Sequence, residues 1–190
     1  SAATNLATNP SFEAGTSGTA LYTGSTFSRT AVGDAASGSY VGRIIRGTAG
    51  SGLLSMVYPV TWSANSPISF RFKVRLSPGS TSSNTINVNL ADYNGGSGTT
   101  APTGCSYQQA GSLSTSTWSD VIVQSCTTAN VTMNAIGIQM VPGQSWLATD
   151  GIEMDSVMIV GALTTPLFAD GNTSSWVWNG TANTSTSTGP

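Results

Sequence analysis

The chain has 190 residues, of which 7% are charged, and its formal net charge is −2. Six cations provide no basic patch for nucleic acid, and the absence of histidine excludes Ser-His-Asp catalysis, Cys-His catalysis and imidazole metal ligands. The sequence has no stretch of about 18 apolar residues that could span a membrane, and we expect any signal peptide to be absent or already removed.

Turn signals such as Asn9-Pro10 and Pro142-Gly143 recur at short intervals, and helical periodicity is nearly absent. Short β-rich runs between such turns are typical of a sandwich or a barrel, so the sequence predicts an all-β fold. The expected strands cover residues 20–29, 39–47, 52–60, 67–76, 84–93, 118–127, 131–141 and 150–160.

Apolar and polar side chains alternate in three of these strands, which places the two kinds on opposite faces. In residues 69–76 the apolar set is Phe70, Phe72, Val74 and Leu76, and the cationic set is Arg71, Lys73 and Arg75. Residues 86–90 and 136–140 repeat the alternation, with amide side chains at Asn87, Asn89 and Gln139. If the three strands are neighbours, these polar groups form one patch.

The chain has two cysteines, Cys105 and Cys126. Outside the cytosol such a pair most simply forms one disulfide, which closes a loop of about 20 residues and contributes roughly 3 kcal/mol. Two thiols cannot complete a zinc site without other ligands. Since a sequence does not show the geometry that a bridge needs, a reduced pair stays an alternative.

Catalysis has little support in the sequence. Two carboxylates could form a glycosidase pair, but the eight available ones lie mostly at turns or strand ends, where such residues are usually solvated or cap a turn. They are Glu13, Asp34, Asp92, Asp120, Asp150, Glu153, Asp155 and Asp170. We therefore expect no enzymatic activity.

The sequence changes character after Gly161, where a Ser/Thr/Asn-rich segment with two tryptophans begins. We expect residues 1–161 to form a globular domain and residues 162–190 to form a C-terminal extension that packs on the domain or on a neighbour. Phe168, Trp176 and Trp178 would supply apolar surface, which usually marks an interface.

Four segments carry a resemblance to a known family. They are NLATNPSFE (5–13), ASGSYV (36–41), STWSDV (116–121) and GIEMDSVMI (151–159). In this order they resemble the jelly-roll carbohydrate-binding modules of the families 4, 9 and 22 type, although Ala36 replaces a usual histidine and Ser156 replaces a second aspartate. The resemblance implies a jelly-roll β-sandwich.

The extension adds a second resemblance. Its segments TPLFADG (165–171) and WVWNGTANTS (176–185) resemble the ending of minor tail proteins of phages that infect actinobacteria. That resemblance implies a domain on the tail tip, with other tail proteins as partners and a homo-oligomer, such as a trimer, as the assembly.

The family resemblance also implies a structural cation, usually calcium. Glu13 and Asp155 would be its side-chain ligands, and backbone carbonyls near Ala36, Gly38 and the N-terminal turn would complete it. Calcium takes six to eight oxygen ligands of these kinds. In the alternative interpretation, Glu13 binds a turn amide and Asp155 only begins a strand.

Sugar sites combine aromatic platforms with planar polar groups. The expected hydrogen-bonding residues are Arg71, Lys73, Asn87, Asn89 and Gln139, with Trp146 or Tyr22 as the stacking surface. An ordinary solvated sheet face is the alternative. Core positions are expected for Trp62, Trp118, Met56, Met140, Met154 and Met158.

The sequence thus predicts a non-catalytic, carbohydrate-binding-like module in a phage tail that attaches to a host cell-surface polysaccharide. One alternative is a structural tail protein whose polar face contacts neighbouring subunits. Another is a secreted bacterial module that targets a glycoside hydrolase.

Overall fold

The structure is a computed structural model that describes residues 2–15, 19–20, 24–58, 60–61, 63–81, 83–94, 97–100, 106–108, 111–128 and 135–190. Within these residues the chain forms antiparallel strands and turns and no helix, so the expected all-β fold is confirmed. In the described part, no helix is long and apolar enough to cross a membrane.

One layer of the sandwich is a five-stranded sheet with the order β10-β6-β12-β4-β3. Its strands are β3 (Thr26–Ala31), β4 (Tyr40–Ile45), β6 (Pro67–Leu76), β10 (Ser119–Thr127) and β12 (Gly151–Val160). The central strand β12 is buried along its whole length. Its register against β6 shifts between Asp155 and Met158, and Ser156 in this bulge has a φ of 55°.

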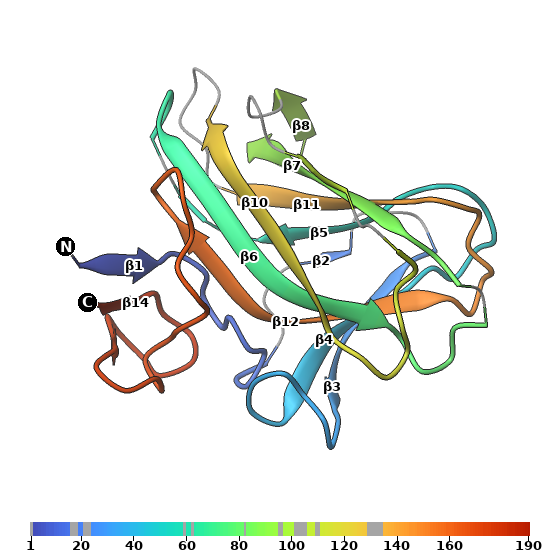
Figure 1. The fold of residues 1–190 in the computed structure, drawn as a ribbon, viewed down its shortest axis with the longest axis horizontal. Coiled ribbons are helices and arrows are strands. Elements are labelled where there is room, and N and C mark those ends of the chain that lie inside the picture. Colours follow the sequence, from blue (N-terminus) through green and yellow to red (C-terminus); the bar gives the residue numbers. More distant parts are fainter. Residues whose placement is uncertain are drawn as a thin grey trace.

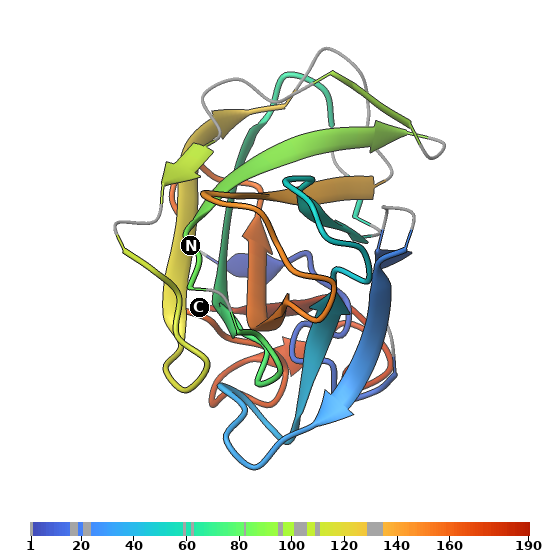
Figure 2. The same ribbon diagram turned by 90° about the vertical axis from the view of Figure 1, so that its right-hand side faces the viewer.

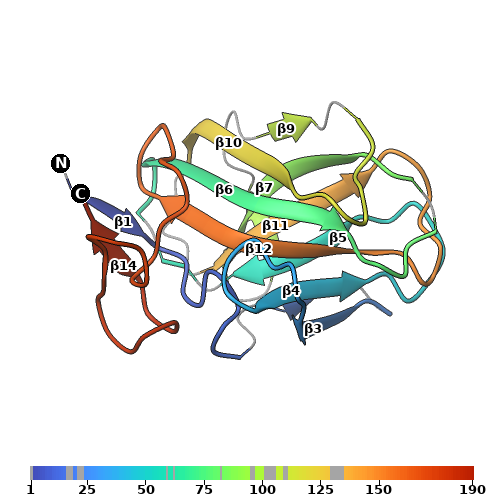
Figure 3. The same ribbon diagram turned by 60° about the horizontal axis from the view of Figure 1, so that its bottom comes forward.

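The other layer is a six-stranded sheet with the order β2-β5-β11-β7-β8, and β9 also pairs with β7. Its strands are β2 (Thr19–Ala20), β5 (Leu54–Tyr58), β7 (Ile86–Asn94), β8 (Ser97–Thr100), β9 (Ser106–Gln108) and β11 (Ala135–Pro142). Figure 3 shows β10, β6, β12, β4 and β3 in front of β7, β11 and β5. The two layers form the expected jelly-roll β-sandwich.

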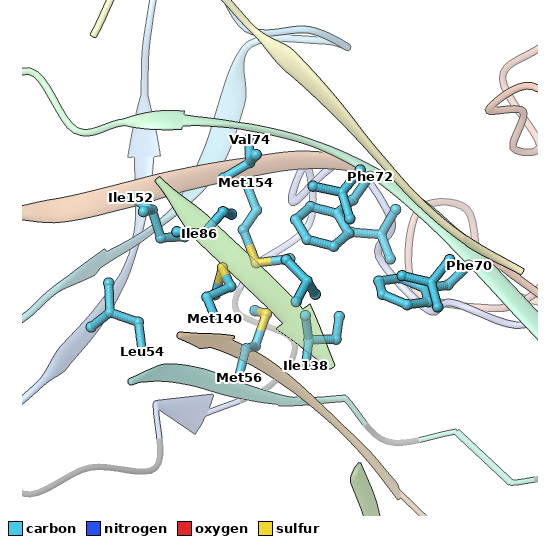
Figure 4. Packing of buried hydrophobic residues seen from close by; sticks show 14 of the residues in the cluster. Leu54, Met56, Phe70, Phe72, Val74, Ile86, Ile138, Met140, Ile152 and Met154 are labelled. Carbon is cyan, nitrogen blue, oxygen red and sulfur yellow. The ribbon is translucent and has the colours of Figure 1, made fainter. Parts of the chain in front are cut away.

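The core lies between these layers because strands of both sheets, among them β5, β6, β7, β11 and β12, turn apolar side chains inwards (Figure 4). The expected inward set of β6 is buried, and it packs with the apolar residues of the facing sheet. That facing set is Leu54, Met56, Ile86, Val88, Ile138 and Met140. Met154 on β12 is fully buried in the same cluster, so the expected core position is confirmed for Met56, Met140 and Met154. Met158 is also fully buried, but it pairs with Arg71 and lies outside this cluster.

The C-terminal extension folds back onto the start of the chain. Its strands β13 (Val177–Trp178) and β14 (Ser187–Gly189) form a three-stranded sheet with β1 (Ala3–Asn5), in the order β1-β14-β13. The two termini therefore lie close together (Figure 1 and Figure 2). The buried Asn5 side chain donates hydrogen bonds to the carbonyls of Val157 at 3.0 Å and Ala169 at 3.2 Å, which joins β1, β12 and the extension.

The strand expected over residues 20–29 is wrong as a single element. The chain turns at Gly24, which has a φ of +89°, so β2 and β3 lie on either side of it in different sheets. The other expected strands are confirmed to within a few residues where the structure describes them, and residues 59 and 131–134 of the expected ranges lie outside that part.

Candidate functional site

The outer face of the six-stranded sheet carries uncharged amide side chains. Asn87 and Asn89 alternate with the buried Ile86 and Val88 on β7, so both point away from the core. Gln139 on β11 pairs in register with Asn89 on one side and with Ser55 of β5 on the other. Asn87 is exposed and the other two amides are partly exposed. An amide both donates and accepts hydrogen bonds, as a sugar hydroxyl requires.

The outer face of the five-stranded sheet is charged, and the charges around Glu153 pair with one another. Glu153 on β12 is fully buried and accepts hydrogen bonds from Arg43 Nε at 2.9 Å and from Arg75 Nε at 2.7 Å. Asp34, in the β3–β4 loop, binds both terminal nitrogens of Arg75 at 2.6 and 2.9 Å. This hydrogen bonding to Arg75 holds the pKa of Asp34 below its usual value of 3.8.

Trp118 covers this charged network. Its ring lies 4.4 Å from the Arg75 guanidinium, and its indole nitrogen donates to the Asp34 carbonyl at 2.9 Å. The expected core position of Trp118 is therefore wrong, because the ring stacks on a cation on the outer face. Glu153 is an exception to the expected pattern of carboxylates at turns and strand ends, since it lies inside β12 and is buried between two arginines.

The single polar patch predicted from alternation is wrong. Arg71 and Lys73 lie on the five-stranded sheet, whereas Asn87, Asn89 and Gln139 lie on the six-stranded sheet. Both sheets turn their apolar sides to one core, so their polar sides point in opposite directions. Lys73 pairs with Asp120 at 2.9 Å, and Arg71 donates to the carbonyl of Pro166 at 3.3 Å.

Trp146 and Tyr22 are the two aromatic residues predicted to stack against a sugar. Trp146 is fully buried in the core, so the prediction that it offers a stacking surface to a sugar is wrong. Its backbone pairs with Gly50, which holds the loop after β11 against the loop before β5. Tyr22 and Trp62 lie outside the described residues, as does Cys105. Cys126 is buried on β10, and its pairing with Cys105 stays a prediction.

Glu13 and Asp155 come together beside the loop that connects β3 to β4. Glu13 Oε1 accepts hydrogen bonds from the backbone N–H groups of Ser39 and Tyr40, both at 2.9 Å. Asp155 Oδ2 accepts one from the Ser37 N–H at 2.8 Å. Burial, with a smaller contribution from the charge of Glu13, raises the pKa of Asp155 to about 7.

Two carboxylates against one loop are of the ligand type that a hard divalent cation takes. No group of three or more acidic or cysteine side chains that could hold a metal occurs among the described residues, so backbone oxygens would also be needed. Gly38 provides space, because a Cβ there would lie 2.4 Å from Glu13 Cδ. Carbonyl ligation by Ala36 and Gly38 stays a prediction.

Asp170 of the extension lies close enough to Glu13 for their charges to interact, and no motif in the sequence indicates this. Burial raises its pKa, and the charge of Glu13 raises it further. Its carboxylate accepts a hydrogen bond from the Asn172 N–H at 2.9 Å, as expected for a residue that begins a turn. The connection to Glu13 spans most of the chain, so no local pattern could have indicated it.

The fold is that of carbohydrate-binding modules. The chain matches the C-terminal family 22 carbohydrate-binding module of Clostridium thermocellum Xyn10B with a TM-score of 0.58 and 12% identity, over 82% of this chain and 92% of that one. No family model and no curated protein sequence matches the chain.

Two larger proteins contain a similar domain. The arabinose-bound MgGH51 α-L-arabinofuranosidase matches with a TM-score of 0.57 and 13% identity, over 82% of this chain and 26% of that one. The enzymatically active domain of tailspike protein 4 from bacteriophage CBA120 matches with a TM-score of 0.53 and 13% identity, over 82% of this chain and 21% of that one. This chain therefore spans about a quarter of each.

Proposed function

We propose that this chain is a non-catalytic carbohydrate-binding module that holds its glycan on the outer face of the six-stranded sheet. The observation that carries the proposal is the row of uncharged amides at Asn87, Asn89 and Gln139 on neighbouring strands. Adjacent strands lie about 4.8 Å apart, so the row offers donors and acceptors at a spacing that suits successive hydroxyl groups.

The two outer faces differ in what they leave available to a ligand. On the five-stranded sheet, Glu153 and Arg75 are buried and bind one another, and Trp118 stacks over the arginine. The amides of the six-stranded sheet carry no charge, so a neutral glycan does not have to break an ion pair in order to bind them. This contrast favours the amide face for a neutral polysaccharide.

We propose a phage tail as the setting and a host cell-surface polysaccharide as the partner. The extension resembles the ending of phage minor tail proteins, and a phage tailspike contains a similar fold. In this setting the module is part of the virion and meets its ligand outside the cell. The two rivals are a structural tail protein and a secreted module that targets a glycoside hydrolase.

A glycan array that includes envelope polysaccharides of the host and plant cell-wall polysaccharides tests the proposal. Binding to the envelope glycans alone supports the tail adhesin. Binding to the plant polysaccharides alone supports the secreted module. Failure to bind any glycan, on folded protein, would leave the structural tail protein as the better account.

We further propose that calcium binds Glu13 and Asp155 and stabilises the fold. The cation would neutralise two neighbouring carboxylates and hold the β3–β4 loop, whose N–H groups already bind them. Its role would be structural, because the carboxylates lie at the loop next to the five-stranded sheet and the amide row lies on the other sheet.

A further inference from the structure

A small hollow lies where the C-terminal extension crosses the outer face of the five-stranded sheet. Its volume is about 90 Å³. Pockets for drug-sized ligands measure roughly 300–1,000 Å³, whereas one water takes up about 30 Å³ of liquid. The hollow is therefore sized for one small chemical group. Its lining residues are Arg71, Lys73, Asp120, Ser156, Leu167 and Phe168.

The charges of this lining sum to +1. Lys73 and Asp120 form an ion pair at 2.9 Å, so they offset one another. Arg71 forms no ion pair within the described residues, and its Nη1 makes a long hydrogen bond of 3.3 Å to the carbonyl of Pro166. One negative charge in the hollow would make the lining neutral.

Arg71 also has a donor that the described residues do not satisfy. Its Nε is buried and has no hydrogen-bond partner there. A buried donor without an acceptor costs about 1–3 kcal/mol. Because Nε is covered, a ligand in the hollow meets the terminal nitrogens of the guanidinium, with which a carboxylate forms a charge-assisted hydrogen bond.

The remaining walls define the rest of the ligand. Ser156 reaches the hollow from the bulge of β12, where its positive φ turns the backbone out of the regular strand. Leu167 and Phe168 of the extension supply apolar surface on the other side. The hollow thus offers a cation and a hydroxyl-bearing residue next to a small apolar wall.

We propose that this hollow binds the carboxylate of a short acid of the lactate type, with its methyl group against Phe168 and Leu167. The acid can be free in solution, or it can be an acidic substituent on a glycan segment other than the one on the amide row, which lies on the opposite face. Only the second source rests on the proposed carbohydrate-binding function.

An NMR titration with sodium lactate, against sodium chloride at equal ionic strength, tests the site in the full chain. Saturable shifts of the Ser156, Leu167 and Phe168 amides are expected. Arg71→Gln should weaken lactate binding at least tenfold, the size expected when a charge-assisted hydrogen bond is lost. Phe168→Ala should weaken it less and serves as a second variant if Arg71→Gln does not fold.

Asn89→Ala, on the opposite face, is the matched control and should leave lactate binding unchanged. Shifts that do not saturate would overturn the proposal, and so would equal lactate affinity in wild type and Arg71→Gln. For the second source, a glycan found on the array is compared before and after reduction of its carboxyl groups. If reduction weakens binding of the glycan to wild type but not to Arg71→Gln, the result supports an acidic substituent. If reduction leaves the affinity of wild type for the glycan unchanged, the result supports the free acid.

These experiments distinguish a failure of the acid site from a failure of the proposed carbohydrate-binding function. Saturable lactate binding that depends on Arg71, together with no glycan binding at all, would overturn the carbohydrate-binding function and leave the acid site standing. Glycan binding that depends on Asn89 but not on Arg71, with no lactate shifts, would overturn the acid site and leave the carbohydrate-binding function standing.

Discussion

Glu153 is the residue on which the charged face of the sandwich depends. It is fully buried, and it accepts hydrogen bonds from Arg43 and Arg75 across the two strands that flank β12. Removing one partner of a buried ion pair costs about 3–5 kcal/mol, because the remaining charge stays buried without compensation.

Glu153→Gln should therefore lower the free energy of unfolding by about 3–5 kcal/mol in urea denaturation. Asp120→Asn is the matched control, because it breaks the partly exposed pair with Lys73, and such a pair contributes only about 0–1 kcal/mol. A loss in Glu153→Gln no larger than that in Asp120→Asn would contradict the assigned role of the buried network.

Asp34 makes the contribution of this network to folding stability depend on pH. Hydrogen bonding to Arg75 lowers the pKa of this carboxyl in the folded state, so it is lower than the value of 3.8 in the unfolded state. Its contribution to stability is therefore complete above pH 3.8 and is lost as the pH falls through the lowered folded-state pKa.

Asp34→Asn should reduce the melting temperature at neutral pH and flatten its fall on acidification below about pH 4. Melting curves of both proteins across the acid range measure this. An unchanged acid limb in Asp34→Asn would show that the contact with Arg75 contributes nothing to the acid sensitivity of the fold.

At the scale of elements, the extension is attached to the domain through Asn5. Besides its two donor bonds to Val157 and Ala169, the Asn5 side chain accepts hydrogen bonds from the N–H groups of Ala7 and Ile159, both at 3.1 Å. The tryptophans of the extension pack on its own glycines, since a Cβ at Gly171 would lie 2.3 Å from Trp178 and one at Gly189 would lie 2.4 Å from Trp176.

Asn5→Ala should destabilise the fold by several kcal/mol, since each buried backbone group that loses its partner costs about 1–3 kcal/mol. The same substitution should make the extension the first segment cut by a protease. Ser174→Ala, at an exposed position of the same segment, is the control. Equal proteolysis of the two variants would contradict the role given to Asn5.

The strands themselves could be predicted because alternation is a local property. The alternation at Phe70, Phe72 and Val74 already shows which side of β6 faces a core. Alternation does not show which sheet a strand joins, so Arg71 and Asn89 were expected on one face and lie on opposite faces. Strands of two to four residues, such as β1 and β13, are too short for alternation to show.

The candidate site was predictable to a similar extent. Asn87, Asn89 and Gln139 were expected to share a face, and they do. The burial of Trp146 and the partners of Glu153 depend on residues far away in the sequence, at separations of 78 and 110 for the two arginines. Local pattern contains no information about such contacts.

For the whole molecule, calcium is predicted to act as a stabilising ligand. A ligand that binds only the folded state raises stability by mass action, so chelation should lower the melting temperature. Glu13→Gln should remove most of this sensitivity. A melting curve that excess chelator leaves unchanged, on protein then shown to be metal-free, would exclude the site.

The assembly is predicted to be a homo-oligomer, such as a trimer, held in part by the extension. Its exposed apolar side chains are Leu163, Leu167 and Val177, with 54%, 78% and 63% of their surface exposed. Replacing Leu163 and Val177 with serine should shift the sedimentation profile towards monomer. Wild-type protein that already sediments as a monomer at high concentration would defeat the prediction.

The central claim is that a glycan binds the amide row of the six-stranded sheet. Each hydrogen bond to a neutral group contributes about 1 kcal/mol net, so single-site affinity should be weak and an oligomer would gain through multivalency. The most direct test measures the affinity of Asn89→Ala/Gln139→Ala for the glycan that wild type binds, with Thr26→Ala on the other sheet as control. We predict at least tenfold weaker binding by the double variant, at an unchanged melting temperature, and no change in the control. Undiminished binding by the folded double variant would contradict the account.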